Sequence, residues 1–180
     1  MTRRYAFLIP MISTLVSAQP VLQSGDISYV PGEAFVEHTC PWIDPGPGGA
    51  DQVWNFGALD CPNTWTNTWI APFATMNEDW PTTTVVWNSQ SRFEMYEAST
   101  DAFRALGFSE GITLTSARYD DPSDEIRYPF TYGDSYTDTW NGWNYFPDGT
   151  GGQDSSAVSG TLAVEADGHG TLILPFGTIE

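Results

Sequence analysis

Apolar and polar residues alternate along much of the chain, and this period of two is typical of β-strands. Residues 82–87 (TTTVVW) are β-branched and aromatic, residues 88–90 have the composition of a turn, and residues 92–98 (RFEMYEA) alternate again. Two strand-like segments separated by a short polar turn predict a β-hairpin.

Further strand-like segments follow at intervals of about ten residues, as they do in all-β folds. They are residues 101–108, 112–119, 132–140, 156–166 and 171–174. A turn at Asp167-Gly168 predicts that the last two form a second hairpin. Helical periodicity is scarce, and only residues 99–107 fit a helical turn as well as a strand. The pattern predicts a single all-β domain, an antiparallel β-sandwich of jelly-roll-like form.

The first residues have the pattern of a secretory signal peptide. A cationic start is followed by an apolar stretch at 5–16, and Val16 and Ala18 are the small residues that a cleavage site requires. We therefore expect a signal peptide at 1–18 and an extracellular domain at 19–180. The alternative is a buried N-terminal helix. No later stretch reaches ~18 apolar residues, so we expect no membrane insertion after cleavage.

The charge balance excludes one class of partner. The chain carries 23 Asp and Glu against 6 Lys and Arg, a formal net charge of −17. Such a surface repels phosphate backbones, so we expect no nucleic acid partner. A hydrophobic content of 41% is enough to form a core, so the acidity does not indicate disorder.

The two cysteines, Cys40 and Cys61, are the only ones in the chain. An even number of cysteines in an exported protein favours a disulfide, which would close a loop of about twenty residues and stabilise the fold by about 3 kcal/mol. The alternative is a Cys2His2 zinc site that also uses His38 and His169.

Three segments resemble secreted Bacteroidota proteins of the type IX secretion kind, which carry a C-terminal sorting domain. Residues 44–59 (DPGPGGADQVWNFGAL) resemble their DPG-x-x-GA-x-Q-x-WDFS-x-L segment, residues 129–138 (PFTYGDSYTD) their PF-x-YGDSF-x-D segment, and residues 166–177 (ADGHGTLILPFG) their ADGYGTLILP-x-G segment. The resemblance implies the β-rich N-terminal region of a protein exported to the cell surface or medium, as a fragment or a truncated product that ends at Glu180. It supplies no catalytic residues.

Two enzyme hypotheses compete with simple binding. Gly133-Asp134-Ser135 resembles the first block of GDS-type esterases, with Ser135 as nucleophile, but Asp167-Gly168-His169 lacks their Asp-x-x-His spacing. The surrounding residues alternate as a strand does. Glycoside hydrolysis needs two carboxylates, and Glu94 and Glu97 face opposite sides of a strand. Each could pair with a carboxylate from a neighbouring strand, so no catalytic residue is assigned from sequence.

Sugar binding without catalysis fits the eight tryptophans better, because flat aromatic side chains stack on sugar rings. Trp140, Trp143 and Tyr145 cluster with asparagines in a segment, 140–146, whose glycine predicts a loop. The alternative is that these aromatics fill a small β-core.

Calcium is the one cofactor that the sequence indicates, and only weakly. The segment 148–154 begins with Asp148, ends with Asp154 and is rich in glycine, and residues 120–125 are a second acidic stretch. Neither matches the EF-hand pattern, and solvated turns explain both. We expect no other cofactor.

Together these observations predict a secreted or cell-surface, non-catalytic domain that contacts a polysaccharide or a surface protein. The alternative is a secreted hydrolase, a glycoside hydrolase before a GDS-type esterase.

Overall fold

A computed structural model describes residues 19–27, 29–111 and 113–179. The expected signal peptide, 1–18, lies outside the described residues. The described chain is an all-β fold of strands with one short helix, so the predicted fold class is confirmed.

In chain order, the elements are β1 (Val21–Leu22), β2 (Ala34–Thr39), β3 (Gly49–Asn55), β4 (Asn63–Ile70), α1 (Met76–Asp79), β5 (Val85–Ser89), β6 (Arg92–Ala98), β7 (Ala102–Glu110), β8 (Thr115–Arg127), β9 (Phe130–Thr131), β10 (Ser135–Pro147), β11 (Gln153–Glu165), β12 (Gly168–Leu174) and β13 (Gly177–Ile179).

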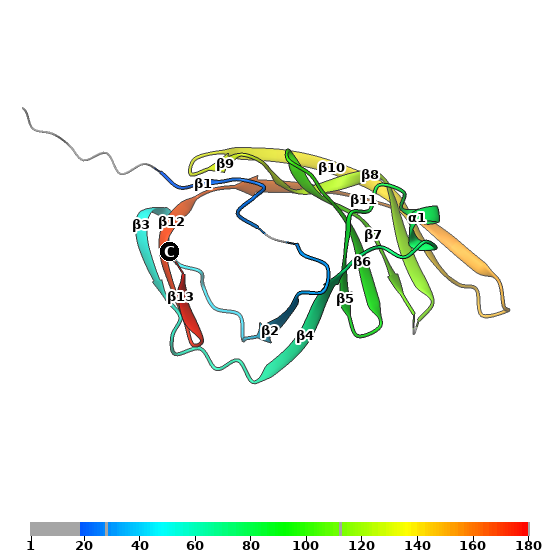
Figure 1. The fold of residues 1–180 in the computed structure, drawn as a ribbon, viewed down its shortest axis with the longest axis horizontal. Coiled ribbons are helices and arrows are strands. Elements are labelled where there is room, and N and C mark those ends of the chain that lie inside the picture. The colour runs from blue at the N-terminus through cyan, green and yellow to red at the C-terminus, as the bar shows by residue number, and fades with distance from the viewer. Residues whose placement is uncertain (1–18, 28, 112, 180) are drawn as a thin grey trace, which may run out of the picture.

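Eight strands form one antiparallel sheet in the order β11-β10-β8-β7-β6-β5-β4-β2, which we call the large sheet. The large sheet is curved, and α1 lies outside the curve (Figure 1). A three-stranded sheet, β13-β12-β3, lies across the molecule from β5, β6 and β7 (Figure 1). A two-stranded pair, β1-β9, completes the fold.

The predicted hairpin is confirmed as β5 and β6, which pair from Val85↔Tyr96 to Ser89↔Arg92. Because side chains alternate along a strand, Met95 of β6 points to one face and its neighbours to the other. Met95 is fully buried with Val86, Leu106 and the α1 residue Met76. We call this the outer face, because α1 lies on it, and the opposite side the inner face.

The outer face carries the main hydrophobic core of the described residues. Its cluster consists of Met76, Trp80, Val86, Met95 and Leu106. Trp80 is 7% exposed, and its indole N–H donates to the Ala117 carbonyl of β8 at 3.2 Å, which satisfies its one polar group inside the core.

The predicted disulfide joins Cys40 and Cys61. β2 and β4 are paired as far as Thr39↔Asn63, and the chain between them leaves the large sheet to form β3. The disulfide follows directly after this last pair and holds together the two ends of the segment that contains β3. Both cysteines are used by the bridge, so the zinc alternative is wrong; His38 instead stacks on Phe176 with ring centroids 4.4 Å apart.

Three local expectations are wrong. Residues 140–146 do not form a loop but belong to the 13-residue strand β10, and the acidic stretch 120–125 lies inside β8 rather than in a turn. Strands β11 and β12 do not form a hairpin with each other, because β12 pairs in parallel with β3 and antiparallel with β13. The pairing of β12 with β3 joins segments far apart in the sequence, and local patterns do not predict it.

No helix within the described ranges has the length and apolar content needed to cross a membrane.

Candidate functional site: a cavity on the inner face of the large sheet

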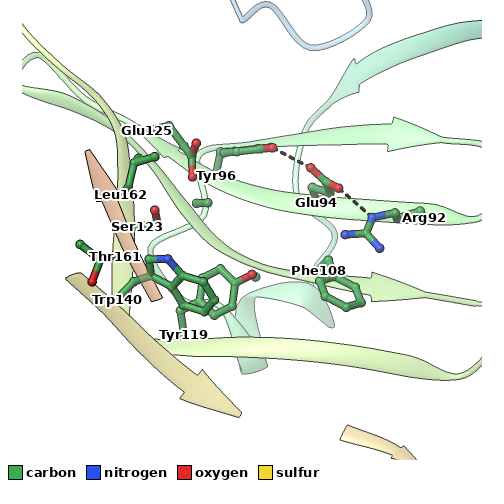
Figure 2. Close-up of a pocket in the computed structure, with 12 residues that line it drawn as sticks. Arg92, Glu94, Tyr96, Phe108, Tyr119, Ser123, Glu125, Trp140, Thr161 and Leu162 are labelled. Carbon is green, nitrogen blue, oxygen red and sulfur yellow. Dashed lines mark hydrogen bonds and ion pairs between the residues drawn. The ribbon is translucent and has the colours of Figure 1, made fainter. Parts of the chain in front are cut away.

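A cavity of about 340 Å³ opens on the inner face. Its lining comes from five neighbouring strands, β6, β7, β8, β10 and β11. Figure 2 shows Glu125, Tyr96 and Glu94 along one side of this cavity and Trp140, Tyr119 and Phe108 along the opposite side. The cavity therefore has one side rich in oxygen atoms and one aromatic side.

Glu94 is fixed by two donors from its own strand. Arg92 Nε donates to Glu94 Oε1 at 2.7 Å, and the Tyr96 hydroxyl donates to Glu94 Oε2 at 2.7 Å. Burial raises the pKa of Tyr96, and the hydrogen bond to Glu94 adds to this rise, so Tyr96 stays a donor at all ordinary pH values. The Arg92 guanidinium also lies 4.0 Å from the centre of the Phe108 ring. Residues two apart on a strand share a face, so the strand itself brings these three polar groups together.

The aromatic side is built on β8 and β10. The rings of Tyr119 and Trp140 lie 4.8 Å apart and are tilted by 41°. Gly160 of β11 pairs with Trp140, and a Cβ placed on Gly160 would come within 2.6 Å of the Trp140 ring. Only glycine leaves the space in which this indole lies, so residue 160 determines the position of Trp140.

Glu125 reaches the cavity because β8 has a bulge. The pairing with β7 passes from Phe103↔Ile126 directly to Arg104↔Asp124, so Glu125 is an extra residue without a partner in the ladder. An extra residue in one strand changes the direction of its side chain, and bulges are frequent beside functional sites.

Two more register shifts lie at the same cavity. Leu106 is the extra residue between the pairs Met95↔Gly107 and Tyr96↔Ala105, and Asp120 is the extra residue beside Tyr119. The regular ladder of the large sheet is thus interrupted on several sides of this cavity.

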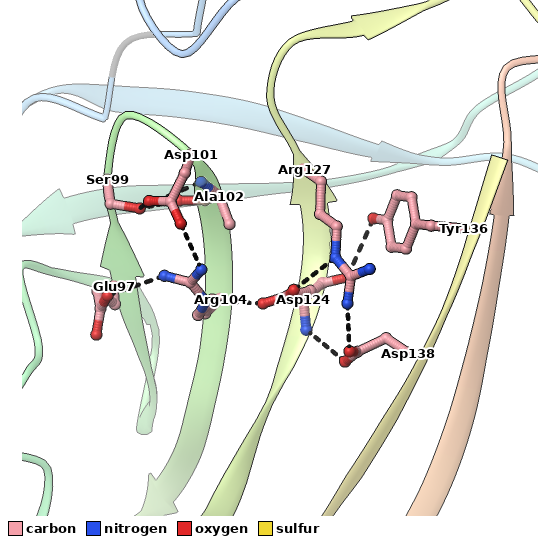
Figure 3. A network of polar contacts seen from close by, with 9 residues as sticks. All are labelled: Glu97, Ser99, Asp101, Ala102, Arg104, Asp124, Arg127, Tyr136 and Asp138. Carbon is pink, nitrogen blue, oxygen red and sulfur yellow. Dashed lines mark hydrogen bonds and ion pairs between the residues drawn. The ribbon is translucent and has the colours of Figure 1, made fainter. Parts of the chain in front are cut away.

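A network of charged side chains holds the bulge that presents Glu125 (Figure 3). Asp124 accepts hydrogen bonds from Arg104 Nε and from Arg127 Nε, both at 2.7 Å, and its backbone N–H donates to Asp138 Oδ2 at 2.9 Å. Arg127 also donates to Asp138 Oδ1 at 2.7 Å. The residue before Glu125 is therefore tied to β7 and β10 at once.

The environment of Glu125 favours its protonated form. Burial of the carboxyl raises the pKa of Glu125, the nearby charges of Glu94 and Asp138 raise it further, and a hydrogen bond with Ser123 acts in the opposite direction. Although the residue as a whole is exposed, its carboxyl lies in the cavity.

A second hollow continues the cavity along the inner face. Phe35, Trp69 and Trp87, from β2, β4 and β5, line it together with Glu94 and Tyr96, which also line the first cavity. Phe35 and Trp69 stack with ring centroids 5.7 Å apart. Because the two hollows share Glu94 and Tyr96, we call them together the groove; most of the residues that line its second hollow are aromatic.

The three aromatics that the sequence groups together are divided between the two faces. Trp140 lines the cavity, whereas Trp143 and Tyr145 lie at odd spacing from it on a regularly paired strand and point to the outer face. The Arg118 guanidinium lies 4.5 Å from the centre of the Tyr145 ring and pairs with Asp79 of α1. A single platform of Trp140, Trp143 and Tyr145 is therefore not formed.

The other candidates lie outside the cavity. Asp148 Oδ1 accepts the backbone N–H groups of Thr150 and Gly152 in the β10–β11 turn, and these bonds lower the pKa of Asp148. Asp154 lies in β11, and no group of three His, Cys, Asp or Glu placed to hold a metal ion occurs among the described residues. Calcium binding at Asp148 and Asp154 stays a prediction.

Ser135 begins β10 and pairs with Glu165, as expected for a strand. His169 instead lies against the Tyr132 ring, with ring centroids 5.1 Å apart.

The sequence alone does not indicate that Glu125 lies in the same cavity as Glu94. The alternation of β6 correctly separates Glu94 from Glu97, which instead accepts a bond from Arg104 at 3.1 Å. Glu125 comes from β8, and only the pairing of β6, β7 and β8 brings it to the same cavity.

No family profile, curated protein or solved structure matches this chain.

Proposed function

We propose that the groove on the inner face binds a neutral polysaccharide. The observation that carries this proposal is the two-sided cavity, in which Trp140 and Tyr119 face Glu94, Tyr96 and Glu125 (Figure 2). Sugar rings have apolar faces that stack on aromatic rings and hydroxyl groups at their edges that bond to carboxylates and phenols. The aromatic side of the cavity supplies the stacking contacts, and the opposite side supplies the hydrogen bonds.

The length of the groove supports a chain rather than a single sugar as the ligand. The second hollow adds Phe35, Trp69 and Trp87 to the aromatic surface and shares Glu94 and Tyr96 with the first. A ligand that spans both hollows contacts strands from β2 to β11.

The charge of the protein favours neutral polymers over uronic acid polymers. The chain has a formal net charge of −17, and the Arg92 guanidinium in the cavity is already paired with Glu94. Arg92 is the one cation among the residues that line the cavity, so a polyanion would meet the carboxylates of Glu94 and Glu125 without an unpaired cation to offset them.

The setting that we propose is outside the cell. The signal-like N-terminus and the resemblance to secreted Bacteroidota proteins support export, and the Cys40–Cys61 disulfide is typical of oxidising compartments. A secreted or cell-surface protein with this groove would meet polysaccharides directly.

A depletion assay tests the proposal. The chain, expressed for export, is mixed with insoluble cellulose, xylan, mannan, chitin and starch, and with pectin as the acidic comparison. We expect depletion by at least one neutral polymer, about tenfold weaker binding for Trp140→Ala, since stacking contributes roughly 1–1.5 kcal/mol, and unchanged binding for Trp143→Ala on the outer face.

A second variant avoids removing the indole itself. Gly160→Val fills the space of the Trp140 ring, whereas Ser159→Val lies on the other face of the same strand. Loss of binding in Gly160→Val alone supports the proposal. No depletion by any neutral polymer, or loss in Trp143→Ala instead of Trp140→Ala, contradicts it.

A further inference from the structure

We propose that Glu125 and Glu94 are the catalytic residues of a glycoside hydrolase that cleaves the polysaccharide bound in this groove. This inference rests on the proposed function, since it needs a sugar chain in the cavity. It adds a reaction, and it assigns a role to each of the two carboxylates that line the same cavity.

Glycoside hydrolysis needs two carboxyl groups with different environments. One must give a proton to the departing oxygen, and the other must act as a carboxylate at the anomeric carbon or on the attacking water. Glu94 and Glu125 come from different strands and differ in their surroundings, as this division of roles requires.

Glu125 has the environment of the acid. Its carboxyl lines the cavity, and partial burial together with the negative charges of Glu94 and Asp138 raises its pKa. A carboxyl group whose pKa is raised keeps its proton to higher pH than an ordinary one and is suited to act as a general acid. The network on Asp124 positions the bulge from which Glu125 reaches the cavity.

Glu94 has the environment of the second carboxylate. Arg92 donates to one of its oxygens and Tyr96 to the other, which fixes the orientation of the carboxylate plane and balances its charge. A fixed, hydrogen-bonded carboxylate in the same cavity as an acid of raised pKa is the arrangement that these enzymes use.

The aromatic side positions the substrate for this reaction. A sugar ring stacked on Trp140 and Tyr119 presents its edge to the side of the cavity that carries Glu94, Tyr96 and Glu125 (Figure 2). The bound sugar chain then holds its glycosidic bond next to both carboxyl groups. Because the reacting groups are already in place, the reaction does not depend on a chance encounter.

The atoms balance with water as the only co-reactant. The bond between the anomeric carbon and the glycosidic oxygen breaks, and Glu125 gives its proton to that oxygen. The anomeric carbon takes a hydroxyl group from water, with Glu94 either assisting the water directly or first bonding to the carbon. If Glu94 assists the water directly, Glu94 takes the remaining proton of the water and Glu125 regains its proton from solvent; if Glu94 first bonds to the carbon, Glu125 takes that proton itself, and nothing is oxidised or reduced in either route.

The test measures released reducing ends and bound protein on the same neutral polymers. We compare the wild-type chain with Glu125→Gln, Glu94→Gln and, as a control, Glu78→Gln in α1 on the outer face, where the side chain is exposed. Circular dichroism establishes that each variant is folded. We expect the wild type and Glu78→Gln to release reducing ends and both cavity variants to lose about 10²–10⁴-fold of the rate while still binding.

Aryl glycosides with good leaving groups separate the two roles. Their departure needs little help from an acid, so Glu125→Gln should release the aryl group in the first turnover nearly as fast as the wild type, whereas Glu94→Gln should stay inactive. The wild-type rate should also fall as the pH rises through the raised pKa of Glu125, and this fall should be absent in Glu125→Gln on the aryl glycosides.

The outcomes distinguish the two proposals. Depletion without released reducing ends overturns the hydrolysis and leaves polysaccharide binding in place. Release that survives in both cavity variants overturns the assignment to Glu125 and Glu94. Neither depletion nor release on any polymer overturns polysaccharide binding, and the hydrolysis with it.

Discussion

The two faces of the large sheet are built from the same strands and differ completely in chemistry. On β6, Met95 is fully buried against α1 on the outer face, whereas Glu94 and Tyr96, its immediate neighbours, line a cavity on the inner face. Under α1 the outer face is apolar and filled, with the Arg118–Asp79 pair and the exposed Trp143 beside that core, whereas at the cavity the inner face is aromatic, charged and hollow. One face can therefore supply the packing that stabilises the sheet while the other stays open for a ligand.

The largest expected loss of stability comes from a substitution on the outer face. Met95→Ala removes a side chain that is fully buried and should lower the free energy of unfolding by about 2–5 kcal/mol. Glu94→Gln, one position away on the inner face, should cost about 1 kcal/mol or less, because its pair with Arg92 is partly exposed. Urea unfolding of both variants measures the difference, and an equal loss would contradict the division between the two faces.

The disulfide should stabilise the fold without contributing to the groove. Replacing Cys40 and Cys61 together with serine should cost about 3 kcal/mol, the chain entropy of a loop of about twenty residues. The disulfide joins the two ends of the segment that contains β3 and does not line the cavity. Binding of the folded variant to the polymer should therefore be unchanged. Thermal unfolding and the depletion assay, run side by side, check both statements; weakened binding in a fully folded variant would contradict the second.

A smaller effect should distinguish the inner face by its pH dependence. Burial raises the pKa of Glu125 in the folded state above its unfolded value, so the contribution of this group is fully present below the unfolded pKa and is lost as the pH rises through the folded pKa. The wild type should therefore lose stability relative to Glu125→Gln as the pH rises from the ordinary glutamate pKa, about 4.3, through the raised folded pKa. Urea titrations across this range measure the difference, and a constant difference would show that the Glu125 carboxyl is not buried in the folded protein.

The smallest expected effect concerns an exposed carboxylate at the end of the charged network. Hydrogen bonds from Ser99 and then Arg104 lower the pKa of Asp101 to about 2. Its contribution is present above the unfolded pKa and is lost as the pH falls through the folded value, so Asp101→Asn should flatten the stability profile slightly between about pH 4 and about pH 2. Thermal unfolding in this window checks it, and a profile that stays as steep in Asp101→Asn would assign the loss to other carboxylates.

The sequence predicts those parts of the fold that depend on local patterns. The β5–β6 hairpin follows from alternation and a polar turn, and the disulfide follows from two cysteines in a chain with a signal-like start. The first half of strand β10 is predicted by the alternation of residues 132–140, but its second half is not, because Gly142 and its asparagine neighbours have loop composition. In the structure, a side chain at Gly142 would collide with the Arg118 carbonyl of β8, so this glycine marks a close approach of two strands.

Of the two carboxylates at the cavity, the sequence can indicate the position of Glu94 but not that of Glu125. Alternation on β6 places Glu94 on the face opposite Met95, which a sequence can indicate. The position of Glu125 depends on a bulge, and the bulge exists only in the pairing of β7 with β8. Trp140 is a candidate from sequence, but its separation from Trp143 and Tyr145 depends on the segment being a strand.

The most direct test of the inner face as the ligand site follows the eight tryptophan indole N–H signals by nuclear magnetic resonance. Soluble oligosaccharides of glucose, xylose and mannose are titrated into the ¹⁵N-labelled chain, with Trp140→Phe and Trp143→Phe used to assign the two signals. We expect the Trp140 signal to shift with at least one sugar while the Trp143 signal stays in place. A shift of Trp143 with Trp140 unchanged would place the ligand on the outer face and contradict the account.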